Sequence, residues 1–310
     1  MGCLKRNMSW RSFLEIIKLC NTPASIISPI PFYAVSLFLI SRQEFSISED
    51  IPILFAGIAV TLLSNFGSNL WNHCNDIKED IAQGKRNILT HDHSMQKKAF
   101  IISVLFYALS LLYVYFLSIE LKKPIYIFFS IWMLMTWWYS DSLILKRLLG
   151  FRLKEHYLGE FITYSITCPM YTLSIWLIYS DLNLKGILIS FACLFIGLLV
   201  MLLKDLKDIS GDRKAGLKTF GVTFLPSQLI KYACYLMVLY YFVMLNPFTL
   251  NFFGNGILMM CIPFIYFMKN TFFHMYKKNW ALDSGDLKAL KGIGISIYSS
   301  FIFLGLSIIF

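Results

Sequence analysis

Two groups of acidic and amide residues have the spacing of a metal-binding site. Each group follows a long apolar segment, and the members are Asn72, Asp76 and Asp80 in the first acid cluster and Asp205, Asp208 and Asp212 in the second acid cluster. The spacings i, i+4, i+8 and i, i+3, i+7 place the members of each cluster on one face of a helix. Ionisable groups near hydrocarbon are costly, so their presence at the ends of two apolar segments indicates a function.

Oxygen ligands of this kind are those that Mg²⁺ prefers. The ion dehydrates reluctantly and usually binds carboxylates together with the phosphate oxygens of a substrate. Two acid clusters that face one cavity would hold Mg²⁺ and a diphosphate between them. The alternative is that these acids are solvated loop charges beside basic neighbours, but a matched pair of clusters favours the metal site. All six cluster residues are therefore predicted metal ligands, and Asp76 and Asp208 are predicted to be essential for catalysis.

The elements that must position the acid clusters are apolar helices. Of the 310 residues, 57% are hydrophobic and 15% are charged, and the mean hydropathy is +0.63, whereas about 25% of the residues of a soluble domain are charged. Apolar segments that approach the roughly 20 residues of a helical span lie near residues 24–41, 51–71, 99–118, 125–140, 157–179, 184–203, 227–247, 252–268 and 292–310. Alternation of period two is not dominant, so a β-barrel is not expected. The predicted fold class is all-α, a polytopic membrane protein with nine transmembrane helices.

The remaining segments are short. Residues 9–20 mix charged and apolar residues at helical intervals, which predicts an interfacial helix before the first span. The seven cysteines lie far apart and form no CxxC pair, so neither a disulfide framework nor a zinc site is expected. Because the chain has no long linker, residues 1–310 are expected to form a single transmembrane domain.

The net charge of +10 follows the membrane topology and does not indicate binding to nucleic acid. If the N-terminus lies in the cytoplasm, one side of the membrane holds all but four of the 28 Lys and Arg residues, the exceptions being Arg42, Lys122, Lys123 and Lys185. This asymmetry is the positive-inside rule. It predicts an integral protein of the cell membrane with a cytoplasmic N-terminus and an active site on the cytoplasmic side, where both acid clusters lie.

Basic and aromatic residues near the acid clusters would complete a site for diphosphate ionisation. Mg²⁺ and cationic side chains neutralise a diphosphate and make it a better leaving group. The predicted diphosphate ligands are Asn72, Arg86, Lys146, Arg147, Arg213 and Lys218, and Lys146 is also expected to act in catalysis. Ionisation leaves an allylic carbocation, which an aromatic face stabilises by about 1–2 kcal/mol when desolvated. Tyr139 is predicted to provide that face, whereas Trp137 and Trp138 are expected to be interfacial anchors.

Three further polar residues are candidates for contact with an acceptor. Glu160 lies near the start of the fifth span, where it either reaches headgroup water or orients or deprotonates an acceptor. Asn65 and Ser68, before the first acid cluster, either line the pocket or form hydrogen bonds between helices. The run from His91 to His93 has metal-ligand residue types, but a solvated loop is expected there because no other ligands accompany it.

The two acid clusters resemble the motifs of the UbiA superfamily of intramembrane prenyltransferases. The first family motif, N-x-x-x-D-x-x-x-D, is met by the first acid cluster, and the second, D-x-x-D-x-x-x-D, by the second acid cluster. The segment from Tyr139 to Arg147 is similar to the family's Tyr-(Ser/Thr)…Lys-Arg segment, and the run from Asp212 to Thr219 is similar to the continuation of the second motif. The resemblance implies nine transmembrane helices around a central cavity, with Mg²⁺ as cofactor and an isoprenyl diphosphate as substrate.

The function that the resemblance implies is Mg²⁺-dependent transfer of an isoprenoid chain from a polyprenyl diphosphate to a small acceptor, an aromatic quinone precursor. The runs 69–72 and 157–160 resemble the naphthoate prenyltransferase branch, but Asp205 and His73 depart from it, which leaves the acceptor open. Two alternatives remain: a terpene cyclase that acts on the diphosphate alone, and a transporter that uses intramembrane carboxylates. The transporter predicts acids deep within the spans, whereas these acids lie at the ends of the spans beside Lys and Arg.

Overall fold

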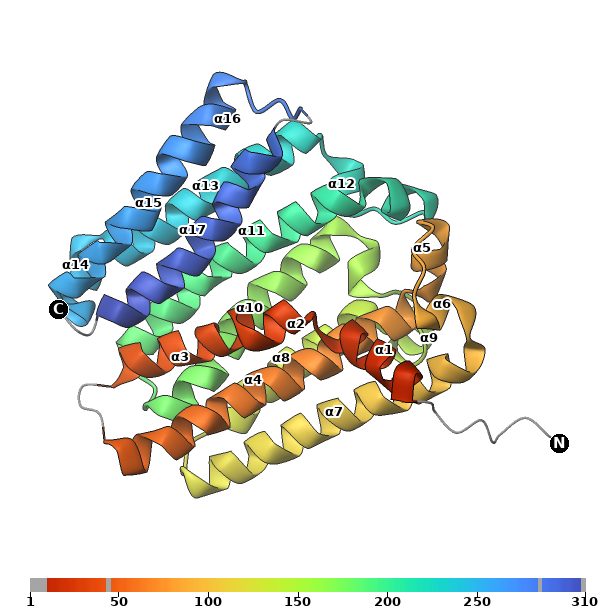
Figure 1. The fold of residues 1–310 in the computed structure, drawn as a ribbon, viewed down its shortest axis with the longest axis horizontal. Helices are drawn as coiled ribbons and strands as arrows, with labels where there is room; N and C mark the ends of the chain where they lie inside the picture. Colours follow the sequence, from red (N-terminus) through yellow and green to blue (C-terminus); the bar gives the residue numbers. More distant parts are fainter. Residues whose placement is uncertain (1–9, 43–45, 284–285, 308–310) are drawn as a thin grey trace.

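The computed structural model describes residues 10–42, 46–283 and 286–307, which form a bundle of long helices joined by short ones (Figure 1). The long helices are α3 (Pro29–Ser41), α4 (Ile47–Asn75), α7 (His93–Glu120), α8 (Ile125–Ser140), α10 (Tyr157–Tyr179), α11 (Leu184–Lys214), α13 (Pro226–Leu245) and α17 (Leu287–Leu306). No strand occurs in these described ranges, where an isolated bridge joins His156 to Lys218. The all-α prediction is therefore confirmed.

Seven segments of the described chain are long and apolar enough to cross a membrane: Pro23–Ser41, Asp50–Asn75, His93–Glu120, Tyr157–Tyr179, Leu184–Lys214, Pro226–Leu245 and Asn255–Lys277. The last of these joins η2 (Asn255–Met260), α15 (Cys261–Phe267), the π-helical turn η3 (Met268–Phe272) and α16 (Phe273–Lys277). Two apolar helices are shorter, namely α8 with 16 residues and Leu290–Leu306 within α17. All nine predicted segments fall mainly on helices, apart from residues 308–310, which lie outside the described part. Length and composition thus support seven spans, and the predicted number of nine is not established.

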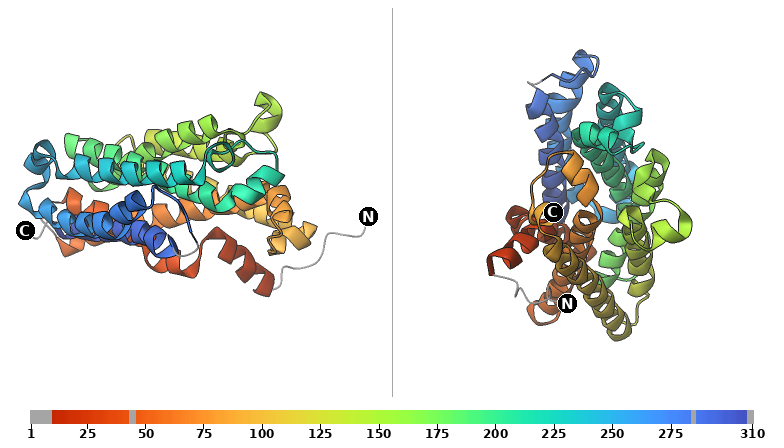
Figure 2. Two further views of the ribbon diagram at one scale, coloured as in Figure 1. Left: turned by 90° about the horizontal axis from the view of Figure 1, so that it is seen from above. Right: turned by 90° about the vertical axis from the view of Figure 1, so that its right-hand side faces the viewer.

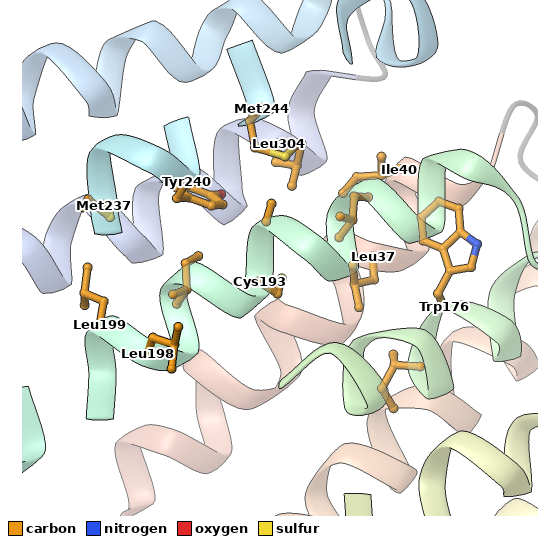
Figure 3. Close-up of a cluster of buried hydrophobic side chains, with 14 of the residues drawn as sticks. Leu37, Ile40, Trp176, Cys193, Leu198, Leu199, Met237, Tyr240, Met244 and Leu304 are labelled. Carbon is orange, nitrogen blue, oxygen red and sulfur yellow. The ribbon is translucent and has the colours of Figure 1, made fainter. Parts of the chain in front are cut away.

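The long helices pack side by side along one direction of the molecule (Figure 2). Helix α11 packs against α10 and α13, α10 packs against α8, α4 against α7, and α17 against α3. Close packing of α10 and α11 depends on a missing side chain, because a Cβ on Gly197 would lie 2.1 Å from Sγ of Cys168. Figure 3 shows where α3, α10, α11, α13 and α17 bury their apolar side chains together, including Trp176, Leu199 and Tyr240.

The short helices around the acid clusters gather at one end of the bundle, on the right of Figure 1. They are α5 (Ile77–Ala82), α6 (Ile88–His91), α9 (Leu145–Leu149), the 3₁₀ turn η1 (Leu153–Glu155) and α12 (Phe220–Thr223). The backbone joins the loop before α10 to the loop after α11. The N–H of Tyr157 donates to O of Lys218 at 2.8 Å, and the N–H of Lys218 donates to O of Glu155 at 2.9 Å. These bonds fix the adjoining ends of α10 and α11 relative to each other.

The helix predicted for residues 9–20 is present as α1 (Trp10–Cys20), and Ser9 lies outside the described residues. Ile16 and Cys20 are buried against Leu70 of α4 and Leu89 of α6, while Trp10 is exposed. This one-sided packing fits an amphipathic helix on the surface of the bundle. The interfacial location of α1 in a membrane remains a prediction. Two further helices are short: α2 (Pro23–Ile27) connects α1 to α3, and α14 (Pro247–Phe253) follows α13.

Candidate active site

The second acid cluster lies on a single helix. Helix α11 continues without interruption to Lys214, so Asp205, Asp208 and Asp212 share one helical segment, as their spacing predicted. Gly211 leaves space for the side chain of Gln83, the residue that follows α5, because a Cβ on Gly211 would lie 2.0 Å from Cγ of Gln83. The contact between α5 and α11 brings the two acid clusters together.

The first acid cluster lies across a bend. Helix α4 ends at Asn75, and Asp76, with φ −101° and ψ 12°, separates it from α5. The predicted continuous helical face from Asn72 to Asp80 is therefore wrong. A tertiary contact explains the bend, because the N–H and Oγ of Ser142 donate to Oδ1 of Asn75 at 2.9 and 2.8 Å and hold the end of α4 against the loop after α8.

Four of the six predicted metal ligands line one cavity, namely Asp76 and Asp80 from the first acid cluster and Asp208 and Asp212 from the second. The volume of this acidic cavity is about 60 Å³. The two clusters therefore face each other as expected, the first around the end of α4 and the second within the last ten residues of α11.

The other two predicted ligands lie beside the cavity. Oδ1 of Asn72 accepts a hydrogen bond of 2.6 Å from Oγ of Ser140. Asp205 is only 1% exposed, and among the described residues its Oδ2 has no hydrogen-bond partner. A buried carboxylate oxygen without a partner retains lone pairs for a further ligand, and a set of hard oxygen donors fits Mg²⁺. In the described part of the chain, no three acidic, His or Cys side chains already converge as a metal cage.

Lys85 lies between the two acid clusters. Its Nζ is 3.5 Å from Oδ1 of Asp80 and 3.6 Å from Oδ1 of Asp208. His73 adds a second basic neighbour, with Nδ1 3.6 Å from Oδ2 of Asp80. Burial would raise the pKa of Asp80, but His73 and Lys85 hold that pKa below its ordinary value. Asp80 is therefore ionised at neutral pH.

Lys154 places a second ammonium group in the cavity. Its Nζ donates to Oδ1 of Asp76, and its side chain is only 9% exposed. The turn η1 that carries Lys154 packs directly on the start of α10, because a Cβ on Gly159 would lie 2.1 Å from O of Leu153. The position of Lys154 is therefore set by the backbone around it.

The buried Arg152 ties together the segments around Lys154. Its Nη2 lies 2.6 Å from Oε1 of Glu79 on α5, and its Nε lies 2.9 Å from Oε1 of Glu155 in η1. Burial would raise the pKa of Glu79, but Lys154 and Arg152 hold it below its ordinary value. Burial would likewise raise the pKa of Glu155, and Lys146 and Arg152 lower it. This ion-pair network, called the Arg152 clamp below, connects α5 to the loop that carries Lys154.

A chain of hydrogen bonds joins three further side chains of the cavity. Nζ of Lys204 donates to Oη of Tyr139 at 2.9 Å, and this hydroxyl donates to Oε1 of Glu160 at 3.0 Å. The second carboxylate oxygen of Glu160 accepts from the N–H of Phe220 at 3.3 Å. Tyr139, Glu160 and Lys204 all line the cavity. The geometry thus joins two residues proposed from the sequence to a lysine that was not proposed.

The sequence of the chain matches the UbiA prenyltransferase family over residues 29–289. The chain belongs to this family. A protein of Archaeoglobus fulgidus without an assigned function is 30% identical over 282 residues, which cover 89% of this chain and 92% of that relative. The predicted resemblance is therefore confirmed.

Two solved structures of similar proteins share the fold. One is of a digeranylgeranylglyceryl phosphate synthase, with a TM-score of 0.66 and 18% identity, covering 96% of this chain and 98% of the other. The second is of a UbiA homologue from Archaeoglobus fulgidus bound to DMAPP and Mg²⁺, with a TM-score of 0.58 and 16% identity, covering 95% of this chain and 99% of the other. At these identities the likeness shows the fold, which is UbiA-like. The family match and the seven long apolar segments together support an integral membrane protein.

The basic residues predicted to bind phosphate lie outside the acidic cavity of this UbiA family member. Nζ of Lys146 lies 2.5 Å from Oε1 of Glu155 and lines a neighbouring depression. Arg86 lines a third depression, beside α1. The remaining three, namely Arg147, Arg213 and Lys218, are exposed and do not line the acidic cavity. The cations that do line it are Lys85, Lys154 and Lys204.

The polar and aromatic candidates away from the cavity have structural partners. Nδ2 of Asn65 donates to O of Thr61 at 2.8 Å and to Oη of Tyr171 at 3.3 Å, which is the interhelical alternative. Ser68 lies within hydrogen-bonding reach of Tyr107. Trp137 stacks on Trp71 with ring centroids 3.9 Å apart, and its role as an interfacial anchor stays a prediction.

The run from His91 to His93 is predicted as a solvated loop, but His91 ends α6 and His93 begins α7. Oδ1 of Asp92 accepts from the N–H of Ser94 at 2.8 Å and caps α7, so the run from His91 to His93 ends one helix and begins the next. For two of the three missed cavity lysines, Lys85 and Lys204, the sequence contained a weak signal. Lys85 follows Gly84, whose φ of +73° marks a tight turn after the first acid cluster, and Lys204 directly precedes the second. Lys154 had no such signal, because only the folding of the loop after α8 brings it to Asp76.

Proposed function

We propose that this protein transfers an isoprenyl chain from its diphosphate to a small acceptor within the membrane, with Mg²⁺ bound by the acid clusters. The observation that carries the proposal is the meeting of both acid clusters in one cavity, where Asp80 and Asp208 are close enough to share the ammonium of Lys85. The homologues from Archaeoglobus fulgidus that bind DMAPP or GPP together with Mg²⁺ support it. Membership of a prenyltransferase family supports the reaction class.

The metal would be held by the carboxylates of Asp76, Asp80, Asp205, Asp208 and Asp212, with Asn72 next to them. When bound, Mg²⁺ neutralises the diphosphate and makes it a better leaving group. Lys85, Lys154 and Lys204 are the side chains of this cavity that can meet phosphate oxygens. The five basic residues proposed from the sequence, namely Arg86, Lys146, Arg147, Arg213 and Lys218, would add a positive field around the entrance.

The C1–O bond of the substrate would break with its electron pair passing to the diphosphate oxygen. The allylic cation at C1 would then form a bond to the acceptor, which loses a proton. Tyr139, held between Lys204 and Glu160, has a fixed ring that can face the allylic carbon. Glu160 is the carboxylate placed to orient the acceptor or to take its proton. Asn65 and Ser68 would not contact the acceptor directly. They would affect it only by holding together the helices that they connect.

The acceptor is proposed to be a small aromatic molecule such as a quinone precursor. A cyclase acting on the diphosphate alone is the alternative within the family, and the presence or absence of an acceptor-dependent product distinguishes them. The transporter alternative is disfavoured, since the acids meet near the ends of helices α4 and α11 and the chain belongs to a prenyltransferase family.

The proposed site is on the cytoplasmic side of the cell membrane, with the N-terminus on the same side, because the basic loops lie there.

The test is product analysis with the purified protein. Geranyl, farnesyl and geranylgeranyl diphosphates are incubated with a panel of acceptors, with Mg²⁺ or with a chelator, and the products are identified by mass spectrometry. We expect an Mg²⁺-dependent prenylated acceptor.

Asp208→Ala should lower turnover by about 100-fold or more, because carboxylates share the binding of the ion. Asp181→Ala is the matched control, since Asp181 is an exposed acid in the loop between α10 and α11. Full turnover by Asp208→Ala, or with the chelator, contradicts the proposal.

A further inference from the structure

We infer that Lys85 and Lys154 are exchangeable counter-cations of the active site. They neutralise the acid clusters through direct ion pairs, and they release these carboxylates to divalent metal when their ammonium groups move to the phosphate oxygens of the substrate. The inference rests on the proposed function, because it assigns a second role to the same cavity. It concerns how metal and diphosphate binding are coupled.

The ion pairs place both lysines on predicted metal ligands. Lys85 bridges the two clusters, with Nζ 3.5 Å from Asp80 and 3.6 Å from Asp208. Lys154 donates to Asp76. Each of these carboxylate oxygens binds an ammonium group at the position where it would otherwise coordinate a metal ion. An ammonium and a divalent cation therefore compete for the same oxygens.

The size of the cavity requires a rearrangement when substrate enters. Its volume of about 60 Å³ accepts a few water molecules, since a water needs about 10–15 Å³ of volume measured in this way. A diphosphate group has nine heavy atoms and needs more space than that. Some side chain of the cavity must move, and the one with the most room is a lysine.

The two lysines differ in freedom. The side chain of Lys85 is 49% exposed and follows the turn at Gly84, so it can swing outward without disturbing packed neighbours. Lys154 is 9% exposed and its backbone is held by the Arg152 clamp. Lys85 therefore opens the cavity by swinging outward. The backbone of Lys154 stays in place, and only its ammonium group moves from Asp76 to the incoming phosphate.

Coupling of this kind makes a reciprocal prediction. A lysine that competes with metal in the absence of diphosphate weakens metal binding, and a lysine that then binds diphosphate strengthens diphosphate binding. Removal of Lys85 should therefore tighten the binding of metal alone and weaken the binding of pyrophosphate. A lysine with only a structural role would move neither constant in this paired way.

The experiment measures Mn²⁺ binding by electron paramagnetic resonance, with the full-length protein in detergent, with and without inorganic pyrophosphate. Mn²⁺ is the probe because it prefers the same oxygen ligands as Mg²⁺. Lys85→Ala is expected to bind Mn²⁺ alone about 5-fold more tightly than wild type and to gain less affinity when pyrophosphate is added. Lys78→Ala is the matched control, because Lys78 is exposed on α5 and does not line the acidic cavity. Lys154→Gln gives a second, independent reading of the same competition.

The outcomes separate the inference from the proposed function. If Lys85→Ala binds Mn²⁺ no more tightly than Lys78→Ala, while wild type binds both Mn²⁺ and pyrophosphate, the exchange is overturned and the proposed function stands. If wild type binds Mn²⁺ neither alone nor with pyrophosphate, the proposed function itself fails. Unchanged thermal unfolding of Lys85→Ala verifies that the variant is folded.

Discussion

Tyr139 is held through its hydroxyl by charged partners on both sides. Lys204 donates to Oη at 2.9 Å and Oη donates to Glu160 at 3.0 Å. Nζ of Lys204 also lies 5.1 Å from the centre of the Tyr139 ring. A single phenol therefore links an ammonium, a carboxylate and an aromatic face in the proposed site. The hydroxyl orients the ring, and the ring is the part that would meet the allylic cation.

Substitution Tyr139→Phe separates these two roles, because it retains the ring and removes both hydrogen bonds. Hydrogen bonds to charged groups contribute about 1.5–3 kcal/mol each. We expect kcat to fall by about 10- to 100-fold while KM for the diphosphate changes little. Steady-state kinetics of diphosphate release measures both constants, with Tyr126→Phe, an exposed tyrosine of the same helix, as the control. Wild-type kcat in Tyr139→Phe would remove the hydroxyl from the mechanism.

At the scale of secondary-structure elements, the Arg152 clamp holds α5 against η1. Breaking a buried ion pair by removing one partner costs about 3–5 kcal/mol, because an uncompensated charge remains buried. Arg152→Met should therefore lower the thermal stability of the protein in detergent markedly. Arg147→Met, at an exposed position five residues earlier, should leave it nearly unchanged. Equal unfolding midpoints for the two variants would show that the clamp does not stabilise this end of the bundle.

The same clamp predicts how stability depends on pH. The pKa values of Glu79 and Glu155 are lowered in the folded protein, so both carboxylates stabilise it above their unfolded pKa of about 4.5. That stabilisation is lost as pH falls through the lower, folded pKa values. We expect the unfolding midpoint of wild type to drop below about pH 4.5, and the midpoint of Arg152→Met to drop less. Thermal unfolding at a series of pH values measures the difference, and parallel curves would contradict it.

Hydropathy and residue spacing predicted the helices that depend on local sequence. They did not predict the features that depend on contacts between distant parts of the chain. Hydropathy located α10 at residues 157–179, where the structure has it, and spacing placed the second acid cluster on one helix. The bend at Asp76 was missed because Ser142, distant in the sequence, holds the end of α4. Lys146 was preferred to Lys154 for phosphate for the same reason, since only the folded loop shows which of the two lysines reaches the acids.

At the scale of the whole molecule, the acidic cavity and the basic loops lie at one end of the bundle. The loops around α5, η1 and α12 contain the cavity, and the loop that joins α10 to α11 lies at the opposite end of these two helices. Positive charge on one side of a membrane protein is retained in the cytoplasm. The arrangement therefore predicts that a water-soluble diphosphate group reaches the cavity from the cytoplasm, while its apolar chain stays among the helices.

Cysteine accessibility tests this orientation directly. In a variant whose own cysteines are replaced, Lys78→Cys introduces a thiol on α5 and Asp181→Cys introduces one in the α10–α11 loop, and both positions are exposed. A membrane-impermeant maleimide added to intact cells should label Asp181→Cys, and it should label Lys78→Cys only after the membrane is permeabilised. The reverse labelling pattern would place the proposed diphosphate site outside the cell. The loops rich in Lys and Arg would then also lie outside, which contradicts the positive-inside rule. One labelling experiment therefore tests both the orientation predicted from the charge asymmetry and the predicted side of the proposed active site.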